Sequence, residues 1–180
     1  MTAAKSAGES ICIGCGLCCD GTLHATATVQ PPDEATVTAA GLEIGEERGR
    51  RFFRQPCPHF CSGSCSIYSA RPGVCRTYRC ALLENLEAGK IGESDAREKI
   101  ATAKGLVAAV RKIDADAVTP PQRTALAARL NAELRELDGV ERERAAKALL
   151  QIAMLEYLLN QHFLKKKDQA AATEPANNAA

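Results

Sequence analysis

The residues with the clearest chemistry in this sequence are its nine cysteines, which form two short clusters. The first cluster, ICIGCGLCCD, contains Cys12, Cys15, Cys18 and Cys19. The second cluster contains Cys57, Cys61, Cys65, Cys75 and Cys80. Thiols two residues apart on a glycine-containing turn can converge on a soft metal ion, and Gly14 and Gly16 favour such a turn. The spacing therefore predicts metal ligation.

The sequence favours reduced thiols over disulfides. An odd number of cysteines cannot be paired completely within one chain. The first ten residues lack the apolar stretch of a secretory signal, and no run approaches the roughly 18 apolar residues of a membrane span. We therefore expect a cytoplasmic protein. Its formal net charge of +1 offers no electrostatic argument for binding nucleic acid or a membrane surface.

The number of cysteines leaves the kind of metal centre open. Eight thiolates would fill two tetrahedral zinc sites and leave one cysteine over, whereas four would hold one [4Fe–4S] cluster. Cys18 and Cys19 are adjacent, so in an extended segment their side chains point to opposite sides. We expect Cys18 and Cys19 to bind different metals, or one of them to bind none. His59 could replace a cysteine in a mixed site, although a histidine so close to a ligand is more often only its neighbour.

Arginines around the second cluster could support these thiolates. Arg71 and Arg76 are candidates for hydrogen bonding to sulfur, with solvated charge or an ion pair as the alternative for each. We find no Ser-His-Asp arrangement, phosphate-binding glycine loop or paired carboxylate site, and we predict no catalytic residue. Enzyme chemistry, if any, would depend on the metal.

Short elements must position the cysteines. Residues 1–10 are predicted to be a disordered leader. A short strand is expected before Pro31, followed by a brief helix that ends at Gly41. An extended segment over EERGRRFFRQPCP would pack one of Phe52 and Phe53 inward and place the other over the cysteines. The spacing of Cys75, Tyr78, Leu82 and Leu86 predicts one helix between about Arg71 and Gly89.

The chain after Lys90 contains no cysteine and is predicted to be helical. One helix begins after Ser94 as its N-cap and buries a stripe of Ala96, Ile100, Ala103, Val107 and Val110. A second begins at a capping box formed by Thr119 and Gln122, and its buried face is Leu126, Leu130, Leu134 and Leu137. The last runs from about Glu141 to Lys166 and buries Leu149, Ile152, Leu155, Leu159 and Phe163.

The predicted fold class is therefore a small cysteine-rich, metal-bound α+β module, irregular with short strands and helices, followed by an all-α helical hairpin or bundle. The module covers residues 11–89, the helical region residues 90–167, and a disordered tail residues 168–180. Apolar helix stripes usually form core, and a protein partner bound by the C-terminal helices is the alternative.

Four motifs together resemble a known family. They are CxxCxxCC at Cys12 to Cys19, the pair Cys57-Pro58, CSIY at Cys65 to Tyr68, and RPGVCRTYRC from Arg71 to Cys80. This combination, over about residues 11–86, resembles the zinc- or iron-chelating CxxCxxCC domain family, which comprises small bacterial cysteine-cluster proteins often labelled iron–sulfur oxidoreductases.

The resemblance implies which cysteines bind metal. They would be Cys12, Cys15, Cys18, Cys19, Cys57, Cys65, Cys75 and Cys80, with Cys61 outside the pattern. The implied cofactor is zinc or iron, including a [4Fe–4S] cluster, in a structural or metal-handling role. The alternative is an iron–sulfur redox protein or accessory subunit. If the protein is an enzyme, it would be an iron–sulfur oxidoreductase or a cluster-dependent protein-modifying enzyme.

Overall fold

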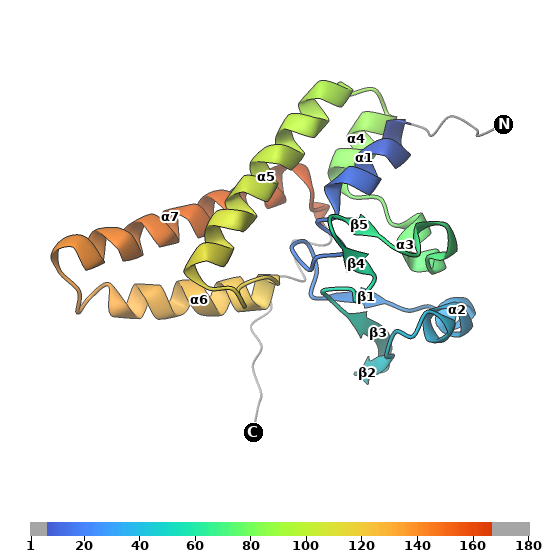
Figure 1. The fold of residues 1–180 in the computed structure, drawn as a ribbon, viewed down its shortest axis with the longest axis horizontal. Helices are drawn as coiled ribbons and strands as arrows, with labels where there is room; N and C mark the ends of the chain where they lie inside the picture. Colours follow the sequence, from blue (N-terminus) through green and yellow to red (C-terminus); the bar gives the residue numbers. More distant parts are fainter. Residues whose placement is uncertain (1–6, 167–180) are drawn as a thin grey trace.

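A computed structural model describes residues 7–166 of the chain (Figure 1). The predicted tail at residues 168–180 and residues 1–6 of the predicted leader lie outside the described residues. Residues 7–10 were expected to belong to that leader and instead begin helix α1 (Ala7–Cys15). The reason is packing: Gly8 lies close to Leu83 and Glu87, and Ile11 is buried in the main core.

Two small antiparallel sheets carry the cysteine-bearing half. In the larger sheet β3 (Arg50–Arg54) lies between β1 (Thr26–Thr28) and β2 (Gly45–Glu47). Alternation along β3 buries Phe53 and leaves Phe52 half-buried. The smaller sheet is a hairpin of β4 (Phe60–Cys61) and β5 (Ser64–Cys65), whose two turn residues both have positive φ. This is the backbone that a tight hairpin turn requires.

The short helix predicted after the prolines is present. A 3-10 turn η1 (Pro31–Asp33) leads into α2 (Glu34–Ala39), and Gly41 follows with φ of 70°. The carboxylate of Asp33 accepts hydrogen bonds from the backbone N–H groups of Gly73, at 3.1 Å, and Val74, at 2.8 Å. Asp33 thereby joins this region to the start of α3 (Gly73–Thr77).

The single helix predicted between Arg71 and Gly89 is wrong. The chain forms a 3-10 turn η2 (Tyr68–Ala70), then α3, and then a separate helix α4 (Ala81–Glu87). Tyr78 and Cys80 have extended backbones between the helices, and Arg79 donates to the carbonyl oxygens of Arg76 and Tyr78 at 2.7 and 3.2 Å. The Arg79 side chain thus satisfies carbonyl groups that a continuous helix would have bonded internally.

Three long helices form the C-terminal half: α5 (Glu93–Ile113), α6 (Pro120–Glu133) and α7 (Gly139–His162). Helix α7 packs against both α5 and α6 (Figure 1). The predicted α5 stripe is buried in full. Gln122 accepts hydrogen bonds from the backbone N–H and the hydroxyl of Thr119 at 2.9 and 2.7 Å, so the predicted start of α6 is confirmed. None of the described helices is long and apolar enough to cross a membrane.

Details of these helices differ from the sequence prediction. Gly92, not Ser94, is the N-cap of α5, and α7 begins at Gly139 and ends at His162. Leu134, Leu137 and Leu149 are only partly buried. Helix ends depend on local hydrogen bonds that a periodic apolar pattern does not encode.

The main core joins the two halves of the chain. It contains Ile11, Leu17, Leu23 and Leu82 from the cysteine-bearing half together with the apolar faces of α5, α6 and α7. A smaller second core consists of Val29, Val37, Leu42 and Phe53. The boundary predicted at residue 90 stays a prediction, and Cys15 and Cys18 of the first cysteine cluster pack against the core that the long helices share.

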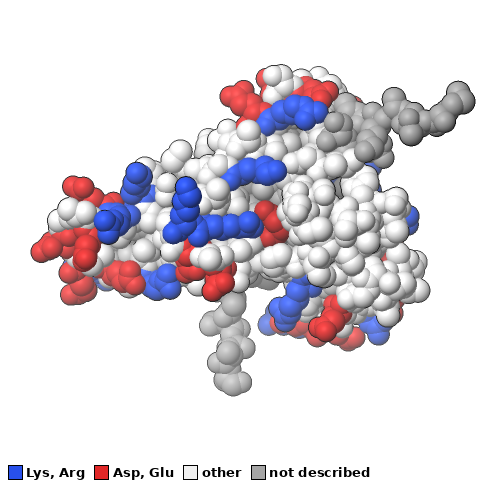
Figure 2. Space-filling view, viewed as in Figure 1, with Lys and Arg blue, Asp and Glu red and all other residues white. Residues whose placement is uncertain are grey.

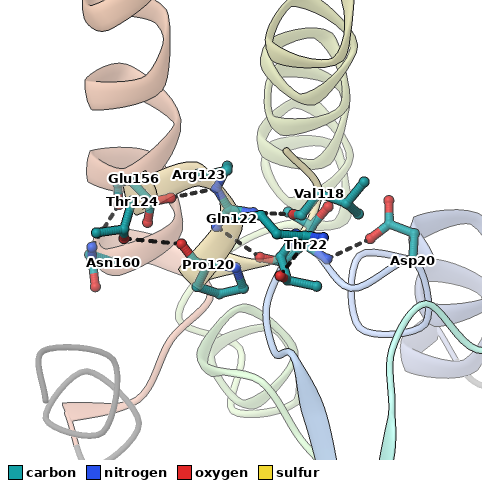
Figure 3. A network of polar contacts seen from close by, with 10 residues as sticks. Asp20, Thr22, Val118, Pro120, Gln122, Arg123, Thr124, Glu156 and Asn160 are labelled. Carbon is teal, nitrogen blue, oxygen red and sulfur yellow. Dashed lines mark hydrogen bonds and ion pairs between the residues drawn. The ribbon is translucent and has the colours of Figure 1, made fainter. Parts of the chain in front are cut away.

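A buried arginine, not foreseen from the sequence, reinforces this junction (Figure 3). The side chain of Arg123 on α6 is 2% exposed. It pairs with Glu156 on α7 at 2.5 Å and donates to the carbonyl oxygens of Thr22, at 3.0 Å, and Val118. The N–H of Thr22 in turn donates to the Asp20 carboxylate, next to Cys19, at 2.9 Å. Arg123 thus connects α6 and α7 to the loop of the first cysteine cluster.

We expect Arg123→Ala to lower the free energy of unfolding by about 3 kcal/mol, because it leaves buried carbonyl groups without donors. Arg129→Ala on the same helix is the matched control, since Arg129 is 57% exposed and pairs with Asp114 at the surface. The control should cost less than about 1 kcal/mol. Urea denaturation of both variants tests this, and equal losses would contradict a joining role for Arg123.

Candidate metal centre

The first cysteine cluster reverses direction at Gly16. Cys12 and Cys15 lie in α1, which ends at Cys15. Gly16 then adopts φ of 75°, and its carbonyl oxygen accepts the N–H groups of Cys19 and Asp20, each at 2.9 Å. This compact turn carries Cys18 and Cys19. The turn predicted from the glycines is therefore present, but it depends on Gly16 alone, because Gly14 lies within the helix.

Gly16 is also required by its contact with Phe60. A Cβ atom at position 16 would lie 2.2 Å from the Phe60 ring. Phe60 lines the same cavity as the cysteines, whereas Phe52 and Phe53 do not. The expectation that one of those two phenylalanines covers the cysteines stays a prediction, since Cys57 and Cys75 pack against the small core that contains Phe53. Phe60 is the aromatic side chain that packs against the turn, and the sequence offered only its position between Cys57 and Cys61 as a signal.

We expect Gly16→Ala to destabilise the protein by about 3 kcal/mol, through the left-handed backbone and the collision with Phe60. Gly14→Ala is the control, because a Cβ at position 14 meets no atom within 4 Å. Alanine should be neutral or stabilising there, since it favours helix over glycine. Denaturant unfolding distinguishes the two. Equal effects would show that the turn tolerates a side chain.

The two cysteine clusters meet through the backbone. The N–H of Cys57, which follows β3, donates to the carbonyl oxygen of Cys19 at 2.8 Å. Cys65 lies on β5, Cys75 lies in α3, and Cys80 immediately precedes α4. The break between α3 and α4 separates the last two cysteines onto different elements.

The cysteines implied by the family resemblance share one cavity of about 460 Å³. Its walls include Cys12, Cys15, Cys18, Cys19, Cys57, Cys65, Cys75 and Cys80. Cys61 does not line the cavity and is exposed. All nine cysteines are free thiols. The fold therefore gathers thiols from both clusters around a common space.

Electrostatic interactions place four of these thiols in one neighbourhood, the first set: Cys12, Cys15, Cys18 and Cys80. The pKa of Cys15 is raised to about 12, mainly by burial, against a backbone hydrogen bond from Leu17 that lowers it and with smaller increases from the charges of Cys80 and Cys12. Burial also raises the pKa of Cys18 well above its ordinary value, with Cys80 as the next cause. The pKa of Cys12 is raised by burial and then by Cys80. Cys80 is thus the partner that the second cluster contributes to the first.

The remaining four thiols are the second set: Cys19, Cys57, Cys65 and Cys75. Burial raises the pKa of Cys19 to about 12, followed by the charges of Cys65, Cys75 and Cys57. Burial raises the pKa of Cys75 to about 11, followed by Cys57 and Cys65. By their largest cysteine partners the adjacent Cys18 and Cys19 fall in different sets, and the charge of Cys19 also raises the pKa of Cys18.

Positive side chains favour the thiolate form most clearly in the first set. Arg71 and Arg79 lower the pKa of Cys12, Lys104 lowers that of Cys15 and Lys165 lowers that of Cys80, each against the larger effect of burial. In the second set Arg71 lowers the pKa of Cys75, whereas Asp20 and Asp33 raise those of Cys19 and Cys75. Soft thiol donors with nearby cations suit zinc or iron.

Two other sequence candidates do not belong to the site. Both ring nitrogens of His59 form hydrogen bonds within the protein. Nε2 lies 2.6 Å from the Ala40 carbonyl oxygen, and Nδ1 lies 3.4 Å from the Ser66 hydroxyl. It does not line the cavity. Arg76 is exposed on α3 and does not line the cavity either, so only Arg71 of the two candidate arginines fits a supporting role.

Aromatic and imidazole groups complete the wall. Tyr68 and Tyr78 both line the cavity, as expected of side chains that cover the cysteines. His24 Nε2 lies 2.7 Å from the Tyr78 hydroxyl, and the two rings meet edge to face. No pattern in the sequence predicts this contact between His24 and Tyr78.

Comparison with protein families identifies the chain. Residues 11–102 match the CxxCxxCC family, described as a "putative zinc- or iron-chelating domain". The chain belongs to this family. The CxxCxxCC match confirms the resemblance seen in the sequence and extends beyond residue 86 into α5, so it contains every cysteine and excludes α6 and α7. Comparisons with curated proteins and with solved structures gave no match.

Proposed function

We propose that this protein is a cytoplasmic metal-binding protein that holds two centres of zinc or iron, each through four cysteine thiolates. The first centre would use Cys12, Cys15, Cys18 and Cys80, and the second Cys19, Cys57, Cys65 and Cys75. The metals would act structurally, or the protein would store or deliver them.

One observation carries the proposal: the eight cysteines of the family pattern line a single cavity, and the ninth does not. The grouping also accounts for the adjacent pair Cys18 and Cys19, since neighbouring side chains can serve two centres. Four thiolates are the ligand number of a structural zinc site and of a [4Fe–4S] cluster.

An iron–sulfur cluster in at least one centre is the alternative. The thiols line a space of about 460 Å³. A [4Fe–4S] group, which takes one thiolate per iron, suits such walls, and it would make an electron-transfer role possible.

Elemental analysis of anaerobically purified protein tests the proposal. We expect zinc or iron in the wild type and an unchanged metal content in Cys61→Ser. Absorption near about 400 nm with acid-labile sulfide would identify iron–sulfur centres, and colourless protein with two zinc ions would identify zinc. Wild-type protein without either metal would refute the proposal.

A protein partner of the C-terminal helices also stays a proposal. Its support is a group of exposed apolar side chains on α7, Leu150, Met154 and Tyr157, which are 60%, 49% and 69% exposed. In the face shown in Figure 2, charges of both signs are interspersed over the helical half. If α7 binds a second copy of the chain, Leu150→Glu should lower the molar mass measured by light scattering, and an unchanged mass would argue against this surface.

A further inference from the structure

Two polar atoms in the cysteine cavity are buried without a hydrogen-bond partner: Nε of Arg71 and the hydroxyl oxygen of Tyr68. Both residues line the cavity. The guanidinium carbon of Arg71 lies 3.8 Å from the centre of the Tyr68 ring, so the two side chains are stacked. A buried N–H without an acceptor is costly to the fold, so each such group calls for an explanation, and a bound group that accepts its hydrogen bond is one.

Arg71 lines the cavity that both sets of thiols line, including Cys12 of the first set and Cys75 of the second. Arg79 differs, because its charge acts on Cys12 and its side chain is engaged by Glu87 at 3.3 Å and by two backbone carbonyl groups. Arg71 therefore combines a free donor, a fixed ring to stack on and access to both sets.

We propose that Arg71, held by Tyr68, is a positioning residue shared by the two metal centres and donates its Nε–H to a cysteine sulfur. This inference rests on the proposed function. Four thiolates around a divalent ion leave a net charge of about −2 on each centre. Two such centres in one cavity repel each other, and a single guanidinium between them offsets part of that repulsion. Removal of Arg71 should then weaken metal binding at both centres to a similar degree.

The test measures zinc affinity of the full-length, reduced protein by competition with a colorimetric chelator. Cys19→Ser isolates the first set and Cys18→Ser isolates the second. In each background we expect Arg71→Gln to weaken zinc binding about tenfold to a hundredfold, the usual effect of removing a group that supports a ligand. Arg71→Lys, which keeps the charge without the planar stack, should give an intermediate loss in both backgrounds.

Arg79→Gln is the matched control, and it should weaken zinc binding only where the first set is isolated. The helical signal in far-UV circular dichroism, to which α5, α6 and α7 contribute, shows whether each variant is folded. An effect of Arg71→Gln in one background alone would assign Arg71 to one centre and overturn the shared role, as would unchanged affinity in both. Failure of the wild type to bind either zinc or iron would instead refute the proposed function on which this inference depends.

Discussion

Cys18→Ser is expected to remove one metal centre and Cys19→Ser the other, although the two residues are adjacent. Each single variant should retain about half of the wild-type metal, and the double variant should retain none, because each centre needs four thiolates. The reason is the fold: Cys18 lies with Cys80, whereas Cys19 lies with Cys57, Cys65 and Cys75. Elemental analysis of the anaerobically purified variants provides the measurement.

Second substitutions identify the set to which each cysteine belongs. Adding Cys80→Ser to Cys18→Ser should cause no further loss of metal, because both residues serve the first set. Adding Cys75→Ser to Cys18→Ser should remove the remaining metal. Cys61→Ser should change neither result, since its thiol lies outside the cavity. If the double variant Cys18→Ser with Cys80→Ser and the double variant Cys18→Ser with Cys75→Ser had the same metal content, the division into two sets would be wrong.

Metal removal is expected to unfold the region around the second set while α5, α6 and α7 persist. The small core beside Cys57 and Cys75 contains only four fully buried apolar residues. Such a small core offsets little of the backbone entropy of residues 24–80, so we expect bound metal to supply much of the folding free energy. Cys15, Cys18 and Cys80 pack instead against the main core, which the long helices share.

Limited proteolysis and circular dichroism before and after chelation provide the measurement. Cleavage should concentrate between residues 24 and 80, while most of the helical signal remains. Mild acid should act like a chelator. Burial raises the pKa of Cys15 and Cys19 to about 12, so at neutral pH a free thiol is protonated and metal binding must release its proton. Affinity therefore rises with pH and falls on acidification. A protease-resistant region after complete metal loss would contradict a structural role.

The sequence by itself determined the family and most of the regular structure. Cysteine spacing predicted metal ligation and the family, and the four-motif pattern separated Cys61 from the other eight. Helical periodicity identified the buried stripe of α5, and the residues Thr119 and Gln122 identified the start of α6. These features depend on neighbours within a few residues along the chain, where a linear pattern carries the information.

The division of the cysteines that we propose, and the contacts around them, could be drawn only from the tertiary structure. The contact of Phe60 with Gly16 and the burial of Arg123 both depend on atoms far away in the sequence. The helical pattern after Arg71 was misleading because Arg79 satisfies carbonyl groups that the pattern assigned to a continuous helix. Long-range hydrogen bonds and packing can override local preference, so a single sequence does not reveal them.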